Sequence, residues 1–250
     1  MKSNSKSDYM LYEKTAGIYD KQRFSGFAGE WGHNRQILIL KNLLRDCSGK
    51  NILEIGCGTG RITEVLANWG AQVTATDISK EMLQVAQDRF SGDQDVPMPT
   101  FRIMSVFDID TNLKQYDYAI MVNVLGRLSD PREAIQQISS KISENCKLIF
   151  TFPCLTSILL PFALIVNARG KSLGRDVTSH WYWPGIIKKY CDDAGLDIVG
   201  WHGNHYVPVP RLLFPTFPLF WTFESLLAKS FPKRCPSVFV VCRHRPADSL

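Results

Sequence analysis

The sequence lacks several features that would assign the chain to a common class of protein. Its seven cysteines are odd in number and none stands in a Cys-x-x-Cys pair, which argues against a disulfide framework and against a zinc site. It has no run of Lys or Arg of the kind found in nucleic-acid-binding tails, although its formal net charge is +5. The opening residues, MKSNSKSDYM, lack the apolar core of a signal peptide. These absences favour a reduced, cytoplasmic compartment and predict no metal site.

Internal repeats and low-complexity linkers are also absent, and one long uncharged stretch is interrupted by proline. Leu148–Ala168 is long enough to span a bilayer, but Pro153 and Pro161 would break a single helix there. We interpret this stretch as a core strand followed by a short apolar helix. The chain has 250 residues, of which 45% are hydrophobic and 21% charged, and we expect one α/β domain over residues 1–250.

The most informative stretch is Asn51–Ile62, with the sequence NILEIGCGTGRI. A short apolar run that carries Glu54 breaks into alternating glycines, and apolar residues then recur at helical spacing. This pattern predicts a buried strand, a glycine turn and a helix. Glycine permits a sharp bend and the close approach of a ligand, and the free N–H groups that open a helix suit an anionic group. The pattern therefore indicates a nucleotide-type cofactor site rather than only a tight connection.

Strands and helices alternate along the rest of the chain. We expect strands over residues 51–55, 72–76, 100–104, 117–122, 147–152, 196–201 and 237–243. We expect helices over residues 9–19, 31–44, 62–69, 80–90, 131–143 and 184–194. Such alternation predicts a parallel sheet covered by helices on both faces, with ligands bound at the carboxyl ends of its strands.

Two helices carry specific sequence signals. Asp130 is expected to cap the helix that starts at Pro131, because proline is favoured at the first helical position. In the helix over residues 31–44, the apolar face is expected to consist of Ile37, Leu38, Leu40, Leu43 and Leu44.

The residues around the glycine turn discriminate between two classes of cofactor. A dinucleotide site requires the pattern G-x-G-x-x-G, but Arg61 stands at the third glycine position. Glu54 would repel a pyrophosphate and attract an ammonium group. Asp77, at the end of the second strand, can accept hydrogen bonds from ribose hydroxyls or cap the next helix together with Ser79. These features favour a ribose-containing cofactor that carries an amino acid over NAD.

The segments Glu54–Gly60 (EIGCGTG), Asp77 and Tyr116–Pro131 (YDYAIMVNVLGRLSDP) together resemble class I S-adenosylmethionine-dependent methyltransferases, in particular the small-molecule and quinone methyltransferases. The resemblance implies a Rossmann-like, seven-stranded, mostly parallel sheet with an antiparallel last strand, helices on both faces, and apolar insertions after strands 5 and 6. It also implies an N-terminal helical lid (1–45), a cofactor-binding core (46–153) and substrate-side insertions (154–182 and 205–235).

The same resemblance implies S-adenosyl-L-methionine as the cofactor. Glu54 would lie near its ammonium group, Asp77 would hold the ribose, and Arg23 would pair with its carboxylate. Ser105 departs from the family pattern, which usually has an acid there to accept from the adenine amino group. The residues implied at the cofactor are Tyr19, Arg23, Glu54, Gly56, Cys57, Gly58, Gly60, Asp77, Ile78, Met82, Ser105, Val106, Asn123 and Val124.

Methyl transfer to a hydroxyl group can need a general base. Arg127 stands where many relatives carry His, and because Arg stays protonated it is not a candidate base. His205, with Tyr206, is the preferred candidate at the end of the sixth strand, and His180 is the next. A structural or surface role is the simpler explanation for each of these histidines.

The insertion over residues 205–235 is rich in aromatic residues and proline, and three interpretations of it stay open. It could be a lid over an apolar pocket, a contact with a membrane surface, or a homodimer face. All three favour a small hydrophobic or aromatic acceptor, and we expect its methylation at oxygen. We expect no nucleic-acid partner, since no basic stripe with interleaved aromatics is present.

Two other functions remain open at this point. One is an NAD(P)-dependent oxidoreductase, which Arg61 and Glu54 disfavour. The other is a catalytically silent S-adenosylmethionine-binding partner subunit, with which the intact glycine turn is also consistent.

Overall fold

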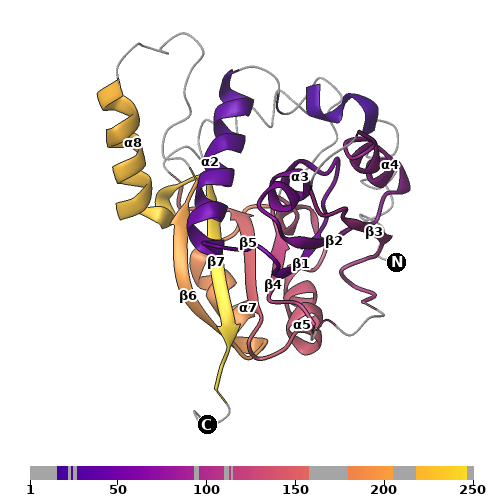
Figure 1. The fold of residues 1–250 in the computed structure, drawn as a ribbon. Coiled ribbons are helices and arrows are strands. Elements are labelled where there is room, and N and C mark those ends of the chain that lie inside the picture. Colours follow the sequence, from indigo (N-terminus) through magenta and orange to yellow (C-terminus); the bar gives the residue numbers. More distant parts are fainter. Residues whose placement is uncertain are drawn as a thin grey trace, which may run out of the picture.

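A seven-stranded sheet forms the centre of the computed structural model (Figure 1). The structure describes residues 16–21, 24, 27–92, 96–109, 113, 115–157, 180–204 and 218–246. The strand order is β3-β2-β1-β4-β5-β7-β6. The strands are β1 (Asn51–Ile55), β2 (Gln72–Asp77), β3 (Thr100–Ile103), β4 (Tyr118–Met121), β5 (Lys147–Pro153), β6 (Leu196–Gly203) and β7 (Ser237–His244).

The direction of the strands agrees with the predicted fold class. Every pair among the first five strands, β1·β2, β2·β3, β1·β4 and β4·β5, is parallel. Strand β7 is antiparallel to both of its neighbours, β5 and β6. The sheet is therefore Rossmann-like and mostly parallel, and its last strand is antiparallel, as expected. In such a sheet the carboxyl ends of β1, β2 and β4 meet at one edge, where ligands bind.

Helices cover both faces of this sheet (Figure 1). Apolar residues of α2 (Phe27–Leu44), α3 (Arg61–Asn68) and α4 (Lys80–Asp88) pack with one face, in a cluster that includes Leu40, Leu66 and Leu83. Residues of α5 (Pro131–Lys141) and α7 (Pro184–Asp193) pack with the other face. The remaining helical elements are η1 (Leu125–Arg127), α8 (Pro218–Ser230) and η3 (Pro232–Arg234). Alternate side chains of the buried strands thus contribute to two separate cores.

The start of α5 confirms its predicted cap. The Asp130 carboxylate accepts a hydrogen bond from the Glu133 N–H at 3.0 Å, and Pro131 occupies the first turn. The cap of α4 differs from one of the expectations, because Ser79 occupies the N-cap position and accepts from the Met82 N–H at 3.2 Å. Asp77 is therefore not the cap residue of that helix.

Helix α2 starts earlier and faces the core differently than its sequence predicts. It begins at Phe27 rather than near residue 31. Leu38, expected on the apolar face, is 49% exposed, whereas Ile39 is buried. The buried stripe runs through Gln36, Leu40 and Leu44 at intervals of four residues. This rotation directs the polar Gln36 side chain inward.

The long uncharged stretch begins, as expected, with a core strand, because β5 ends at Pro153. Residues 158–179, where a short apolar helix is predicted, lie outside the described residues. Within the described ranges, no helix has both the length and the apolar character needed to cross a membrane. In the 205–235 insertion, α8 starts at Pro218 and residues 205–217 are not described, so the three interpretations of that insertion stay predictions.

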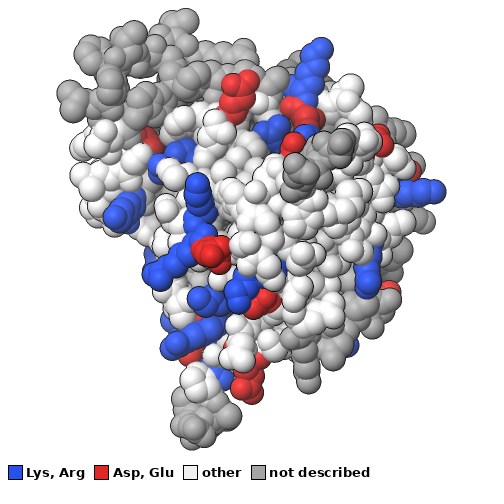
Figure 2. Space-filling view, viewed as in Figure 1, with Lys and Arg blue, Asp and Glu red and all other residues white. Residues whose placement is uncertain are grey.

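The charged side chains of one face are shown in Figure 2. On this face, most Lys and Arg side chains lie among Asp and Glu side chains rather than in a separate patch.

Candidate functional site

The glycine turn after β1 is fixed to the end of the neighbouring strand. The N–H groups of Gly56 and Cys57 both donate to the Thr76 carbonyl, at 2.8 and 2.9 Å. Gly56, Gly58 and Gly60 have φ values of 71°, 56° and 77°, a left-handed region that other residues seldom adopt. A Cβ atom at Gly56 would lie 2.4 Å from Cγ2 of Val124, so the turn also approaches the end of β4 closely. The sequence folds this way because only glycine meets both requirements.

Asp77 links β2 to the glycine turn. Its Oδ2 atom accepts a hydrogen bond from the Gly58 N–H at 2.8 Å, and its Oδ1 atom accepts from the Ser79 N–H at 2.9 Å. Burial raises the pKa of Asp77, and these two hydrogen bonds partly oppose that effect. Because a carboxylate has about four lone-pair sites, both oxygens can still accept from a ligand.

Glu54 is an almost completely buried acid on the floor of the same region. Only 3% of the residue is exposed, and its Oε2 atom accepts from the Thr63 hydroxyl at 2.6 Å. Burial raises the pKa of Glu54 to about 7, and the nearby Asp77 charge contributes in the same direction. A cationic group of a ligand would favour the ionised form of this carboxyl.

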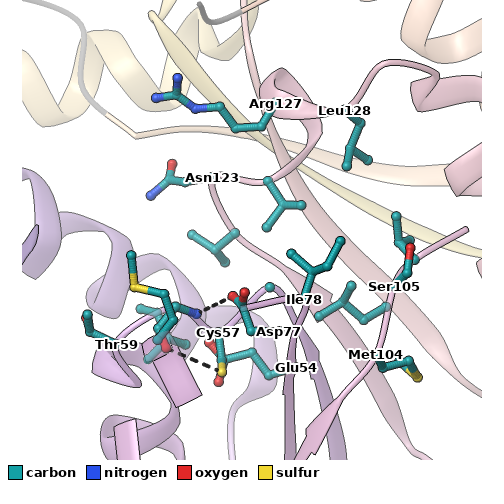
Figure 3. Close-up of a pocket in the computed structure, with 18 of the residues that line it drawn as sticks. Glu54, Cys57, Thr59, Asp77, Ile78, Met104, Ser105, Asn123, Arg127 and Leu128 are labelled. Carbon is teal, nitrogen blue, oxygen red and sulfur yellow. Dashed lines mark hydrogen bonds between the residues drawn. The ribbon is translucent and has the colours of Figure 1, made fainter. Parts of the chain in front are cut away.

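These groups face a cavity of about 620 Å³ at the carboxyl edge of the sheet (Figure 3). In Figure 3, Glu54, Cys57, Thr59 and Asp77 lie at one end of the site, while Met104 and Ser105 lie on the opposite side. The predicted residues that line the cavity are Tyr19, Glu54, Gly56, Cys57, Gly58, Asp77, Ile78, Met82, Ser105, Val106, Asn123 and Val124. The structure therefore brings predicted residues from the N-terminal segment and from the ends of β1, β2, β3 and β4 into one space.

The other predicted site residues are not brought there. Gly60 does not line the cavity. Arg23, His205 and Tyr206 lie outside the described residues. His180 is described, but it is exposed and is not among the residues that line this cavity; its backbone N–H donates to the Gly126 carbonyl at 2.8 Å. The catalytic roles suggested for these residues stay predictions.

Several lining residues were not predicted, and three of them come from the N-terminal part of the chain. Phe24, His33 and Gln36 line the cavity, and the Gln36 amide donates to Oδ1 of Asn123 at 3.2 Å. Burial lowers the pKa of His33 to about 4, with a further contribution from Arg61, so this imidazole is neutral at pH 7. The sequence contained one signal for the inward position of Gln36, because Gln36 precedes Leu40 by four residues and so lies on the same face of the helix. A polar residue in an apolar helix is, however, usually assigned to the surface.

Arg61 is the other unpredicted group with clear chemistry. It follows the glycine turn directly and lines the cavity, and its guanidinium carbon lies 4.0 Å from the centre of the Phe24 ring. Its Nε atom is buried and has no hydrogen-bond partner among the residues that the structure describes. A buried donor without a partner is costly, so a ligand anion at this position would be stabilising.

An ionic cluster attaches the segment before α2 to the glycine turn. The Thr59 hydroxyl donates to Asp20 at 2.6 Å, and Arg89 forms an ion pair with the same carboxylate. Arg89 also donates to the Thr59 carbonyl and pairs with Glu64 at 3.1 Å. The expected N-terminal lid element therefore lies against the site, with Tyr19 and Phe24 on the cavity wall.

The part of the chain that is described contains no group of three His, Cys, Asp or Glu side chains arranged to hold a metal ion. Around the glycine turn of this cavity lie the carboxyl groups of Glu54 and Asp77 and the guanidinium of Arg61. This set of groups suits an organic ligand that has an ammonium group, a carboxylate and vicinal hydroxyls.

Comparisons with known proteins agree with this chemistry. A methyltransferase-domain family matches residues 53–148. The ubiquinone biosynthesis O-methyltransferase of Chromobacterium violaceum is 30% identical over 171 residues, which cover 66% of this chain and 72% of that protein. The corresponding protein of Coxiella burnetii (strain RSA 493 / Nine Mile phase I) is 24% identical over 215 residues, covering 80% of this chain and 90% of that protein.

The fold is shared with solved methyltransferase structures. Magnesium protoporphyrin IX methyltransferase (ChlM) from Synechocystis PCC 6803, solved with bound SAH, aligns with a TM-score of 0.67 at 19% identity, covering 96% of this chain and 100% of that chain. Sequence, fold and the chemistry of the cavity thus agree, and the oxidoreductase alternative is excluded. The chain belongs to the class I S-adenosylmethionine-dependent methyltransferases.

Proposed function

We propose that this S-adenosylmethionine-dependent methyltransferase methylates an oxygen atom of a small apolar or aromatic acceptor. The relatives support the choice of oxygen, because they are named ubiquinone biosynthesis O-methyltransferases, and a further relative is O-methyltransferase cnsE of Penicillium expansum, 29% identical over 123 residues. The side chains of Phe24, Phe107 and Leu128 on the cavity wall support an apolar acceptor.

The residues present fit S-adenosylmethionine. The observation that carries this assignment is the buried pair of acids on one cavity, Glu54 and Asp77, beside a turn that tolerates only glycine. Glu54 would neutralise the ammonium group, and Arg61, with its unpartnered Nε atom, would pair with the carboxylate. Asp77 would accept from the ribose hydroxyls through its remaining lone pairs.

The remaining lining residues would hold the two ends of the cofactor. Ile78 and Met82 would pack against the adenine, and Ser105 and Val106 would contact its polar edge. Gly56, Cys57 and Gly58, with Asn123 and Val124, would border the methionine part. Tyr19 would close the site from the N-terminal segment, and Arg23 remains a further candidate for the carboxylate.

S-adenosylmethionine supplies an electrophilic methyl group on a sulfonium sulfur. The protein's part is to orient the acceptor oxygen in line with that group and to exclude water. The N-terminal segment and the η1 turn provide the walls for this, because Tyr19, Phe24 and Arg127 line the cavity from these two sides. A hydroxyl acceptor must also lose its proton, either to a base such as the predicted His205 or to solvent.

Methyl transfer from radiolabelled S-adenosylmethionine tests this proposal. The purified protein would be incubated with alkyl-substituted catechols and phenols in one series, and with polar hydroxylated metabolites in the other. We expect S-adenosylhomocysteine and an O-methyl product in the apolar series alone. Methylation of polar acceptors only, or transfer at nitrogen or carbon, would contradict the proposal.

A variant at Asp77 separates loss of cofactor binding from loss of folding. Asp77→Asn keeps a hydrogen-bond acceptor for one backbone N–H but loses the charge. We expect this variant to keep the unfolding transition and helical circular dichroism of the parent and to bind S-adenosylhomocysteine at least about tenfold more weakly in calorimetry. Unchanged affinity would exclude Asp77 from the cofactor site.

A further inference from the structure

A second, smaller cavity adjoins the cofactor cavity. Its volume is about 250 Å³, and it shares part of its wall with the first cavity. The shared residues are Tyr19, Phe24, Asn123 and Arg127. The two cavities are therefore neighbours that lie on either side of these shared residues.

The two cavities differ in charge. The first is lined by four acids, Glu54, Asp77, Asp108 and Glu133, as well as by cationic side chains. Among the described residues that line the second, Arg127 is the one charged side chain, and the others include Tyr19, Phe24 and Phe152. The second cavity is thus an aromatic space with one permanent positive charge, and the acidic side chains stand in the first cavity alone.

The position of Arg127 fits a role toward the acceptor rather than the cofactor. In Figure 3, Arg127 lies beyond Asn123 and away from the acids Glu54 and Asp77. It belongs to η1, directly after β4, and the neighbouring Gly126 is packed tightly: a Cβ atom there would lie 2.8 Å from Cγ of Pro153. The backbone that carries Arg127 is therefore fixed against the end of β5.

We infer that the second cavity is the acceptor subsite and that the preferred acceptor is an apolar hydroxy acid, methylated at its hydroxyl oxygen, whose carboxylate is held by Arg127. This inference rests on the proposed function and specifies its substrate class. The planar guanidinium offers paired donors that match the two oxygens of a carboxylate. A carboxylate is ionised at pH 7, whereas an ordinary phenol is neutral and would gain much less from this cation. Tyr19, Phe24 and Phe152 would contact the apolar part of the molecule.

Binding of a matched pair of probes tests this inference without any need for methyl transfer. The probes are 2-naphthoate and 2-naphthamide, which have the same shape and differ in charge. The full chain would be saturated with S-adenosylhomocysteine and titrated with each probe at millimolar concentrations. We expect the acid to bind at least about tenfold more tightly than the amide, and Arg127→Gln to remove that preference. Arg127→Lys should restore part of it, because the charge returns without the paired donors.

Two control variants locate the effect. Arg61→Gln reports on the cofactor cavity, and Arg132→Gln changes an arginine that pairs with Asp193 outside both cavities. Both should keep the preference for the acid, and Arg127→Gln should keep the melting temperature of the parent and be titrated, like the others, at saturating S-adenosylhomocysteine. Equal binding of the two probes, including no measurable binding of either, would overturn the inference. So would a preference that survives in Arg127→Gln or disappears in Arg61→Gln.

The proposed function and this inference can fail separately. If apolar hydroxyl compounds are methylated at oxygen while naphthoate and naphthamide bind equally, the inference alone fails. If the acid is preferred through Arg127 while methyl transfer occurs only to polar acceptors or to other atoms, the proposed function alone fails.

Discussion

The two ends of the site differ in how the chain builds them. At the cofactor end, the glycine turn follows β1 directly, and Asp77 ends the next strand and holds Gly58 by a 2.8 Å hydrogen bond. At the acceptor end, the wall combines residues as distant in sequence as Tyr19, Asn123, Phe152 and Ser237. One end is thus built largely from backbone within a short segment, and the other from side chains of distant segments.

This contrast extends to charge. The cofactor end places two carboxylates in a buried position, which is unfavourable for the empty protein and favourable for a cationic ligand. The acceptor end carries one guanidinium, on Arg127. The comparison teaches that burying Glu54 near the Asp77 charge costs stability in the empty protein, and that a cationic ligand would recover part of that cost.

The largest expected effect is that of neutralising Glu54. Glu54→Gln should lower the affinity for S-adenosylhomocysteine about 100-fold or more in calorimetry, because the ligand ammonium would lose a buried ionic partner. The same variant, free of ligand, should have a higher free energy of unfolding at pH 8, by on the order of 1–3 kcal/mol, because a buried ionised carboxyl is removed. Urea denaturation measures this second effect.

Glu64→Gln is the matched control for that variant. Glu64 lies on α3, the helix that follows the glycine turn, but it pairs with Arg89 at 3.1 Å and does not line the cavity. We expect little change in its affinity for the ligand. If Glu54→Gln bound the ligand as the parent does, the contrast between the two ends would lose its electrostatic basis.

The second largest effect concerns the rigidity of the glycine turn. Gly56→Ala should lower the free energy of unfolding by about 2–4 kcal/mol, since it combines a left-handed backbone with a Cβ atom 2.4 Å from Val124 Cγ2. Gly49→Ala provides the control, because Gly49 has φ 69° but no atom within 4 Å of the added Cβ. We expect it to cost only about 1 kcal/mol. Equal losses in urea denaturation would show that close packing against β4 contributes nothing.

A third, smaller effect is the pH dependence of ligand binding. The pKa of Glu54 is raised to about 7, so the carboxyl is mostly protonated at pH 6 and mostly ionised at pH 8. Affinity for S-adenosylhomocysteine should therefore rise roughly tenfold between these two pH values. The stability of the ligand-free protein should change in the opposite sense, falling as the pH rises through 7, because the folded state favours the protonated form. If the affinity of Glu54→Gln for S-adenosylhomocysteine rose with pH as steeply as that of the parent, a group other than Glu54 would be responsible for the pH dependence.

The contrast between the two ends also explains what could be predicted from the sequence. The strands agree with prediction to within a residue or two, because alternating apolar runs and turn residues define them locally. Glu54, Gly56 and Asp77, which were predicted to lie at the cofactor, do line one cavity. They do so because the end of one strand, the turn after it and the end of the next strand are adjacent in any parallel sheet of this kind.

The part of the wall that α2 contributes could not be predicted in the same way. The position of His33 and Gln36 depends on the rotation of α2, and the apolar pattern of that helix misplaced Leu38. The contact of Gln36 with Asn123 joins residues 87 positions apart, and no local pattern contains it. Strand β6 was predicted to end at residue 201, but it continues to Gly203 because its last residues pair with β7. The residues that pair there are at least 35 positions apart in the sequence, so no local pattern predicts the extension.

The smallest expected effect tests whether the N-terminal segment couples the two ends. Asp20 accepts from Thr59 of the glycine turn and pairs with Arg89, while Tyr19 beside it lines both cavities. Asp20→Asn should weaken binding of S-adenosylhomocysteine about three- to tenfold, because a partly exposed ion pair contributes modestly. Asp88→Asn, which removes only a surface contact with Gln84, should leave binding unchanged. If both variants bind S-adenosylhomocysteine equally well, the N-terminal segment covers the site without contributing to binding. If only Asp20→Asn binds more weakly, the contact of Asp20 with the glycine turn holds in place the segment that carries Tyr19, a wall residue of both cavities.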